Sequence, residues 1–133
     1  MVVNMAQSSV ARPDFAAHDH AYRLSIDKVV GELRGILGAK LVAYIAGVSE
    51  TRAVREWAEG EREPRPPVPE RLRVALQIAE MLLERNSRGV AQAWFQGLNP
   101  RLDDRSPARL LREGDLEDVG PEVLAAARAF VAD

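Results

Sequence analysis

The chain has 133 residues, of which 47% are hydrophobic and 29% are charged, and its formal net charge is −2 at pH 7. This length allows one domain of ordinary size, or two very small ones that share a core, and the composition is that of a folded protein. The negative balance argues against a protein that coats nucleic acid, because such binding depends on neutralising phosphates with Lys and Arg. Length and composition thus exclude a large multidomain enzyme and a disordered chain.

The residue inventory excludes further kinds of chemistry. The sequence has no cysteine and only two histidines, His18 and His20, so we expect no disulfide, no thiol nucleophile, no metal site and no cofactor. No segment has the apolar length of a membrane span or the pattern of a secretion signal. We therefore expect a protein of the reducing cytoplasm, without a membrane partner.

The amino-terminal part is predicted to be an arm followed by a helix. Residues 1–22 mix small, polar and helix-breaking residues without periodicity, which predicts a flexible arm. From Ser25, a suitable N-cap, apolar residues recur at helical spacing as far as Gly38, which is a suitable stop. This pattern predicts a first amphipathic helix.

Prolines and glycines divide the middle of the chain. Four prolines between Glu61 and Pro69 predict a linker of limited flexibility, and a long helix follows from Pro69 to Asn86. Ser87 begins another helix, which is predicted to end near Gly97. Its expected apolar face consists of Val90, Ala91, Trp94 and Phe95.

The carboxy-terminal part is predicted to contain two helices. Ser106 and Pro107 suit the start of a short helix that stops at Gly114, and Gly120-Pro121 is expected to begin the last helix. The predicted inner face of that last helix consists of Val123, Leu124, Ala127, Phe130 and Val131. Because no alternating strand pattern occurs, the fold class is predicted to be all-α.

No catalytic constellation is visible in the sequence. The glycines are isolated and never reach the spacing of a phosphate-binding loop. The acidic pairs Glu61/Glu63 and Asp103/Asp104 stand beside arginines in predicted loops, where solvated surface is the simplest interpretation. We therefore expect that the protein is not an enzyme.

The segment from Leu41 to Gly60 resembles the helix-turn-helix of Cro/repressor-type regulators. A short helix ends at Gly47, and Ser49 is predicted to cap a second helix that contains a Val-x-x-Trp-x-x-Gly pattern. Ala43 is small enough for the two helices to cross closely. The polar residues at the start of the second helix are the expected DNA-binding residues: Ser49, Thr51, Arg52 and Arg55.

Glutamates on the same helix oppose DNA binding. Glu50, Glu56 and Glu59 place negative charge beside the arginines, and the stretch from Gly47 to Trp57 is one residue longer than the common repressor pattern. A helix-turn-helix used only for packing or dimerisation is therefore an open alternative.

The segment from Ala93 to Gly114 resembles the toxin-binding domain of Xre/MbcA/ParS-type antitoxins. In this sequence the pattern consists of Trp94-Phe95 at a helix end, Asn99-Pro100 followed by a basic residue, and the Ser106-Pro107-x-x-Leu-Leu helix that leads to Gly114. The resemblance implies a protein that neutralises a RES-type toxin, an enzyme that degrades NAD, and that represses its own operon by binding operator DNA.

The resemblance also implies a toxin-binding surface. Its expected residues are Trp94, Asn99, Arg101, Arg105, Arg109, Arg112, Phe130, Val131 and Asp133. From the residues alone, Trp94 is most simply a core residue, and Asn99 and Arg105 are turn and capping residues. Phe130 and Val131 could anchor a partner or close this protein's own core, and both interpretations stay open.

The predicted organisation is a repressor-like helix-turn-helix half followed by a small helical toxin-binding domain. We assign residues 1–22 to the arm, 23–68 to the helix-turn-helix and 69–133 to the toxin-binding domain. A homodimer or a larger hetero-oligomer with the toxin is expected, because paired recognition helices are the usual way for so small a module to bind an operator. The alternative is a stand-alone transcription regulator whose carboxy-terminal helices serve oligomerisation.

Overall fold

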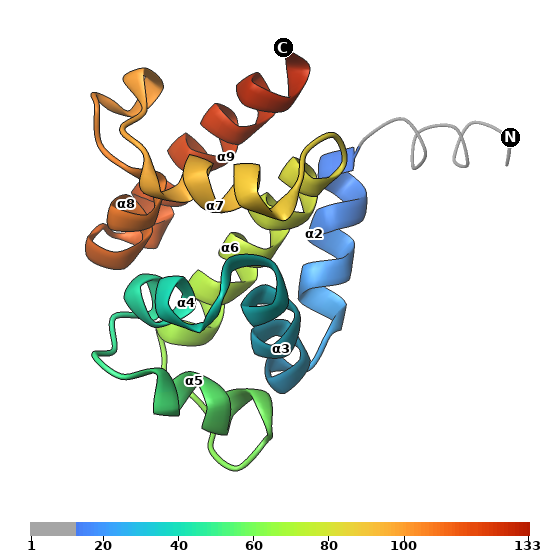
Figure 1. Cartoon of the computed structure of the whole chain (residues 1–133), viewed down its shortest axis with the longest axis vertical. Coiled ribbons are helices and arrows are strands. Elements are labelled where there is room, and N and C mark those ends of the chain that lie inside the picture. The colour runs from blue at the N-terminus through green and yellow to red at the C-terminus, as the bar shows by residue number, and fades with distance from the viewer. Residues whose placement is uncertain (1–12) are drawn as a thin grey trace, which may run out of the picture.

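The computed structural model describes residues 13–133, in which helices are joined by turns and loops (Figure 1). The predicted all-α class is confirmed: the described residues form no strand, only an isolated bridge between Asn99 and Arg105. The helices in chain order are α2 (Pro13–Arg23), α3 (Ile26–Leu37), α4 (Ala39–Ala46), α5 (Thr51–Ala58), α6 (Val68–Leu83), α7 (Arg88–Gln96), the 3-10 helix η1 (Pro100–Leu102), α8 (Pro107–Glu113) and α9 (Leu116–Ala132).

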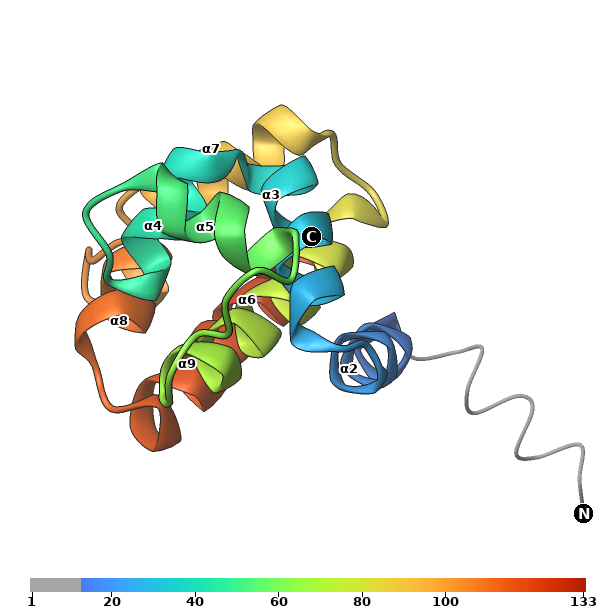
Figure 2. The same ribbon diagram turned by 90° about the horizontal axis from the view of Figure 1, so that it is seen from below.

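Helix α6 is the centre of the fold. It packs against α2, α3 and α4 on the amino-terminal side and against α7, α8 and α9 on the carboxy-terminal side (Figures 1 and 2). A helix enclosed in this way must be apolar on most of its circumference. Its buried residues are Leu72, Val74, Ala75, Leu76, Gln77, Ile78, Ala79, Met81 and Leu82. Both halves of the chain therefore share one hydrophobic core.

The prediction of a flexible arm over residues 1–22 is wrong for the part that the structure describes. Residues 13–22 lie in α2, which buries Ala17 and Ala21 against α6, whereas residues 1–12 lie outside the described residues. This helix could not be predicted from the sequence because its buried side chains are two small alanines, while the large apolar residues Phe15 and Tyr22 are exposed. Such a face has almost no amphipathic signal.

Two arginines on α6 cap the ends of neighbouring helices. Arg73 donates hydrogen bonds from Nη1 to the backbone oxygens of Ala21 (2.8 Å) and Leu24 (2.7 Å), at the end of α2. Arg71 donates in the same way to the backbone oxygen of Ala46 (3.0 Å), at the end of α4. The last carbonyls of a helix have no partner within it, and cationic side chains satisfy them favourably.

Most predicted helix boundaries are confirmed, and the start of the last helix is wrong. The Ser87 and Ser106 hydroxyls accept hydrogen bonds from the backbone N–H groups of residues 90 and 109, as expected for N-caps. The last helix begins at Leu116, not at Gly120-Pro121, because the Asp115 carboxylate caps it by accepting from the N–H of Glu117 (3.2 Å). Pro121 consequently lies inside α9.

In residues 13–133, none of the helices combines the length and the apolar character that crossing a membrane requires.

Candidate functional site

Helices α4 and α5 are joined by the tight turn that the sequence predicts. Gly47 ends α4 with φ 87°, a left-handed conformation that glycine adopts without strain, and its N–H donates to the carbonyl of Ala43 (3.0 Å). Val54 and Trp57 of α5 are buried, and α5 packs against both α3 and α4. The predicted N-cap Ser49 is wrong by one residue, because Glu50 holds that position.

The arginines of α5 are already paired with glutamates. Arg55 Nη1 lies 3.0 Å from Glu59 Oε1 and 3.6 Å from Glu61 Oε2, and Arg52 Nε lies 3.9 Å from Glu56. A hydrogen bond between the carboxyl groups of Glu59 and Glu61 lowers the pKa of Glu59 and raises the pKa of Glu61. The exposed face of α5 is therefore nearly neutral.

A groove of about 700 Å³ lies beside the start of α5. Three of the four expected DNA-binding residues, Ser49, Thr51 and Arg52, line it together with Arg112 of α8. Arg112 donates from Nη1 to the backbone oxygen of Tyr44 (2.8 Å), and its guanidinium lies 4.7 Å from the centre of the Tyr44 ring. Arg112 thus faces α4 and the start of α5, and it does not line the C-terminal surface described below.

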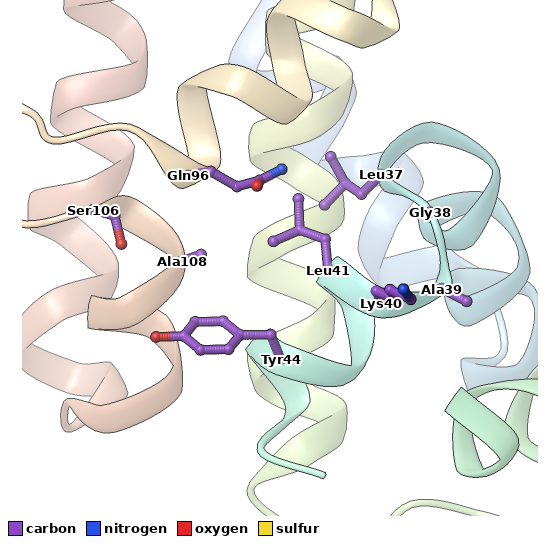
Figure 3. A pocket seen from close by; sticks show the side chains of 9 residues that line it. All are labelled: Leu37, Gly38, Ala39, Lys40, Leu41, Tyr44, Gln96, Ser106 and Ala108. Atoms are coloured by element: carbon purple, nitrogen blue, oxygen red, sulfur yellow. The ribbon is translucent and has the colours of Figure 1, made fainter. Parts of the chain in front are cut away.

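A second groove, of about 600 Å³, lies where α4 meets the end of α7 and the start of α8 (Figure 3). Its lining residues are Leu37, Gly38, Ala39, Lys40, Leu41, Tyr44, Gln96, Ser106 and Ala108. Figure 3 shows the Tyr44 ring extending from α4 toward Ala108, so this side chain lies between the two halves of the chain. None of these residues is among the binding residues expected from the sequence.

A third groove, here called the C-terminal groove, joins the end of α7, the turn after it and the end of α9. It encloses about 560 Å³ and brings together five of the nine expected toxin-binding residues. Those five are Trp94, Asn99, Arg101, Phe130 and Asp133. Residues from positions 94–101 and 126–133 therefore form one surface.

Aromatic contacts form the floor of the C-terminal groove. The Trp94 side chain is 9% exposed, packs edge-to-face on Phe95 with ring centres 5.4 Å apart, and lies 6.3 Å from the ring of Phe130. Phe130 itself is 38% exposed and packs on Trp94 from the solvent side. Trp94 is thus a core residue with one edge in the groove, and its part in toxin binding stays a prediction.

The turn beside the groove is held by Asn99 and Arg105. Asn99 Oδ1 accepts from the N–H of Arg101 (2.9 Å), and its backbone carbonyl accepts from the N–H of Asp104 (2.9 Å). Arg105 donates from Nε to the carbonyl of Leu102 (3.0 Å). Both residues therefore shape the turn, while Arg101 extends from it into solvent.

The remaining expected toxin-binding residues lie elsewhere. Arg109 is paired with Glu113 (3.2 Å) along α8, beside Arg105 on a different hollow of the surface. Val131 is partly buried and packs against the hydrophobic core. The structure therefore does not gather the expected arginines into one patch.

Leu98 is the groove residue that the sequence analysis missed. Its side chain is 75% exposed, the largest exposure of any large hydrophobic residue in the described part of the chain. An apolar residue within a Gly-Leu-Asn-Pro turn, outside any helical period, is a signal that could have identified it.

Comparison with known proteins finds one kind of likeness. A chain of the M. tuberculosis MbcT-MbcA toxin-antitoxin complex is similar to this protein, with a TM-score of 0.61 and 28% sequence identity, over 80% of this chain and 96% of that chain. No protein-family profile and no curated protein matches the sequence. The prediction that this chain is not an enzyme agrees with a likeness to an antitoxin. The chain thus resembles an MbcA-like antitoxin in sequence and in fold, as its motifs predict.

Proposed function

We propose that this protein is the antitoxin of a type II toxin-antitoxin system and that it binds and blocks a RES-type, NAD-degrading toxin. The likeness to a chain of a toxin-antitoxin complex supports the class of function. The observation that carries the proposal is the C-terminal groove, where the exposed Leu98 lies beside Trp94, Phe130 and Asp133. Solvent-exposed apolar side chains next to a hollow are typical of partner-binding surfaces.

The proposed mode of inhibition is steric. Leu98 and Phe130 supply the apolar contact, Arg101 pairs with an acidic residue of the toxin, and the exposed end of α9 enters the toxin's substrate cleft. The Asp133 carboxylate suits a basic site built for the phosphates of NAD. The groove binds the toxin, and the last residues block it.

A matched pair of variants tests the binding surface. Leu98→Ser removes the exposed apolar side chain from the groove, and Val90→Ser removes one from α7 that is 39% exposed and lies outside the groove. Burying a leucine contributes about 1.5–3 kcal/mol, so Leu98→Ser should weaken toxin binding by roughly 10- to 100-fold. Calorimetry with a RES-type toxin measures the effect. Equal affinities for the two variants would refute the groove assignment.

A short truncation separates binding from inhibition. Ala132 and Asp133 are exposed, so their removal leaves the contact between Phe130 and Trp94 in place. The truncated protein should bind the toxin with nearly unchanged affinity but fail to restore cellular NAD. Full restoration of NAD would show that the blocking element is elsewhere, and we would then assign it to the segment from Asn99 to Arg112.

Operator binding through α5 is a second proposed function, supported by the turn geometry around Gly47. Replacing Arg52 and Arg55 with Ala should abolish a gel shift of the operator and leave toxin binding intact. The control is the double variant Arg85→Ala with Arg88→Ala, at the other end of the fold. It should change neither the gel shift nor toxin binding. Glu59→Gln should strengthen the shift, since it removes the closer of the two carboxylates paired with Arg55 and so favours contact with phosphate.

If Glu59→Gln does not change the gel shift and the two double variants bind the operator equally well, α5 serves packing or dimerisation only.

A stand-alone regulator is the competing function. In that case the C-terminal groove would bind a second copy of this chain, and Leu98→Ser would lower the oligomeric mass in light scattering while no RES-type partner bound. If the wild-type protein forms a complex with the toxin and Leu98→Ser does not, the result favours the antitoxin function over the stand-alone regulator.

A further inference from the structure

Three helices bring together one histidine and two glutamates, none of which lines the C-terminal groove. His20 of α2, Glu32 of α3 and Glu80 of α6 each offer a donor atom, and these atoms all lie within 4.8 Å of one another. His20 Nε2 lies 2.7 Å from Glu32 Oε1. The tertiary structure assembles this cluster, because its members are separated by 12 and 48 positions in the chain.

The backbone positions of the three residues are fixed by the core. Each is adjacent in sequence to a fully buried residue, namely Ala21, Leu33 and Ala79. The side chains themselves reach the surface: those of His20 and Glu32 are 44% and 40% exposed, and Glu80 is partly buried. The backbone positions of the donor residues are therefore fixed, while their donor atoms remain accessible to an incoming ion and to water ligands.

The spacing of the donors suits a metal ion after a small adjustment. Ligand bonds of about 2.0–2.2 Å in a tetrahedral site place neighbouring donors roughly 3.4 Å apart. The closest pair here, at 2.7 Å, would open slightly, and no separation exceeds 4.8 Å. Rotation of exposed side chains can change the distances between the donor atoms by this amount at little energetic cost.

The donor set indicates the kind of ion. One imidazole with two carboxylates suits zinc and neighbouring first-row divalent ions, whereas magnesium prefers oxygen ligands and keeps most of its water. Glu84, one helical turn beyond Glu80, adds a further negative charge on the same side of α6. The sequence predicts no metal site because its two histidines lie close together on one segment, whereas the glutamates of the cluster come from other parts of the chain.

We propose that His20, Glu32 and Glu80 form a binding site for a divalent transition-metal ion, with zinc as the representative ion, that joins α2 to α3 and α6. Water completes the coordination on the exposed side. The site is independent of toxin binding, and its ion holds the amino-terminal helix on the core.

Calorimetric titration of the untagged full chain with Zn²⁺ tests the site, with Mg²⁺ as the control ion. One equivalent of Zn²⁺ should bind, and Mg²⁺ should not compete. Glu80→Gln and His20→Gln should each weaken the affinity by at least about tenfold, the loss typical even of outer-sphere changes. His18→Gln is the matched control, since His18 lies on the same helix but stacks on Tyr22 with ring centres 4.4 Å apart.

Stability and exchange give a second readout. Zn²⁺ at about 100 times its Kd should raise the Tm of the wild type by roughly 10 °C and slow hydrogen exchange in α2. Glu80→Gln keeps the shape of the side chain, so this variant should fold and show at most about half of the Tm shift, with less slowing of exchange in α2. Zinc binding that is absent, or that survives unchanged in both Glu80→Gln and His20→Gln, would overturn the proposal and leave the cluster as an ion pair.

Discussion

Trp94 is the side chain on which the carboxy-terminal part of the fold depends most. It is 9% exposed, and its ring contacts those of Phe95 and Phe130 at centre distances of 5.4 and 6.3 Å. Trp94→Ala removes the indole, ends both ring contacts and leaves a space next to the C-terminal groove. Because Trp94 lies on α7 and Phe130 on α9, the change loosens the contact between these two helices.

The expected cost follows from burial. Replacing a buried tryptophan with alanine costs about 3–5 kcal/mol, which includes roughly 0.5–1.5 kcal/mol for each aromatic pair. One edge of Trp94 lies in the groove, so water can enter part of the space, and we expect the lower end, about 3 kcal/mol. A domain of this size is stable by about 5–15 kcal/mol, so the variant should fold with a large loss of stability.

Urea denaturation followed by circular dichroism measures the change. With an m-value of about 1.5–2 kcal/mol/M, the midpoint should fall by roughly 1.5–2 M. Leu98→Ala in the same groove is the control, and its free energy of unfolding should change by less than about 0.5 kcal/mol, since that side chain is exposed. A loss below about 1 kcal/mol for Trp94→Ala would refute the core assignment and place the indole in a partner interface.

Three further substitutions test the helix junctions by the same denaturation assay. Gly47→Ala should lower the free energy of unfolding by about 1–2 kcal/mol, because φ is 87° there and the new Cβ would lie 3.3 Å from Arg71; no change would contradict the left-handed turn. Arg71→Gln should cost about 1–3 kcal/mol through the uncapped carbonyl of Ala46, and a smaller loss would mean that water replaces the guanidinium. Pro121→Ala should instead stabilise the protein by about 1–2 kcal/mol, since proline lacks the N–H that an interior helix position donates, and destabilisation would argue against the start of α9 at Leu116.

The sequence by itself determined the class of the fold, most of the helices and the family resemblance. Ser87 and Ser106 marked helix starts correctly because an N-cap hydroxyl acts on the backbone three residues away, which is a local interaction. Gly47 likewise marked the turn between α4 and α5, since a left-handed conformation is a property of one residue. Features that depend on short-range geometry could therefore be predicted.

The tertiary structure decided the features that depend on packing between distant segments. Helix α2 is held by α6 through Ala17, Ala21 and the Arg73 hydrogen bonds, none of which is visible in a local pattern. The same is true of the grouping of the expected binding residues. Arg101 shares the C-terminal groove with the end of α9, whereas Arg112 turns toward Tyr44 on α4. A side chain's neighbours across the fold are set by how helices cross, and that arrangement is a property of the whole core.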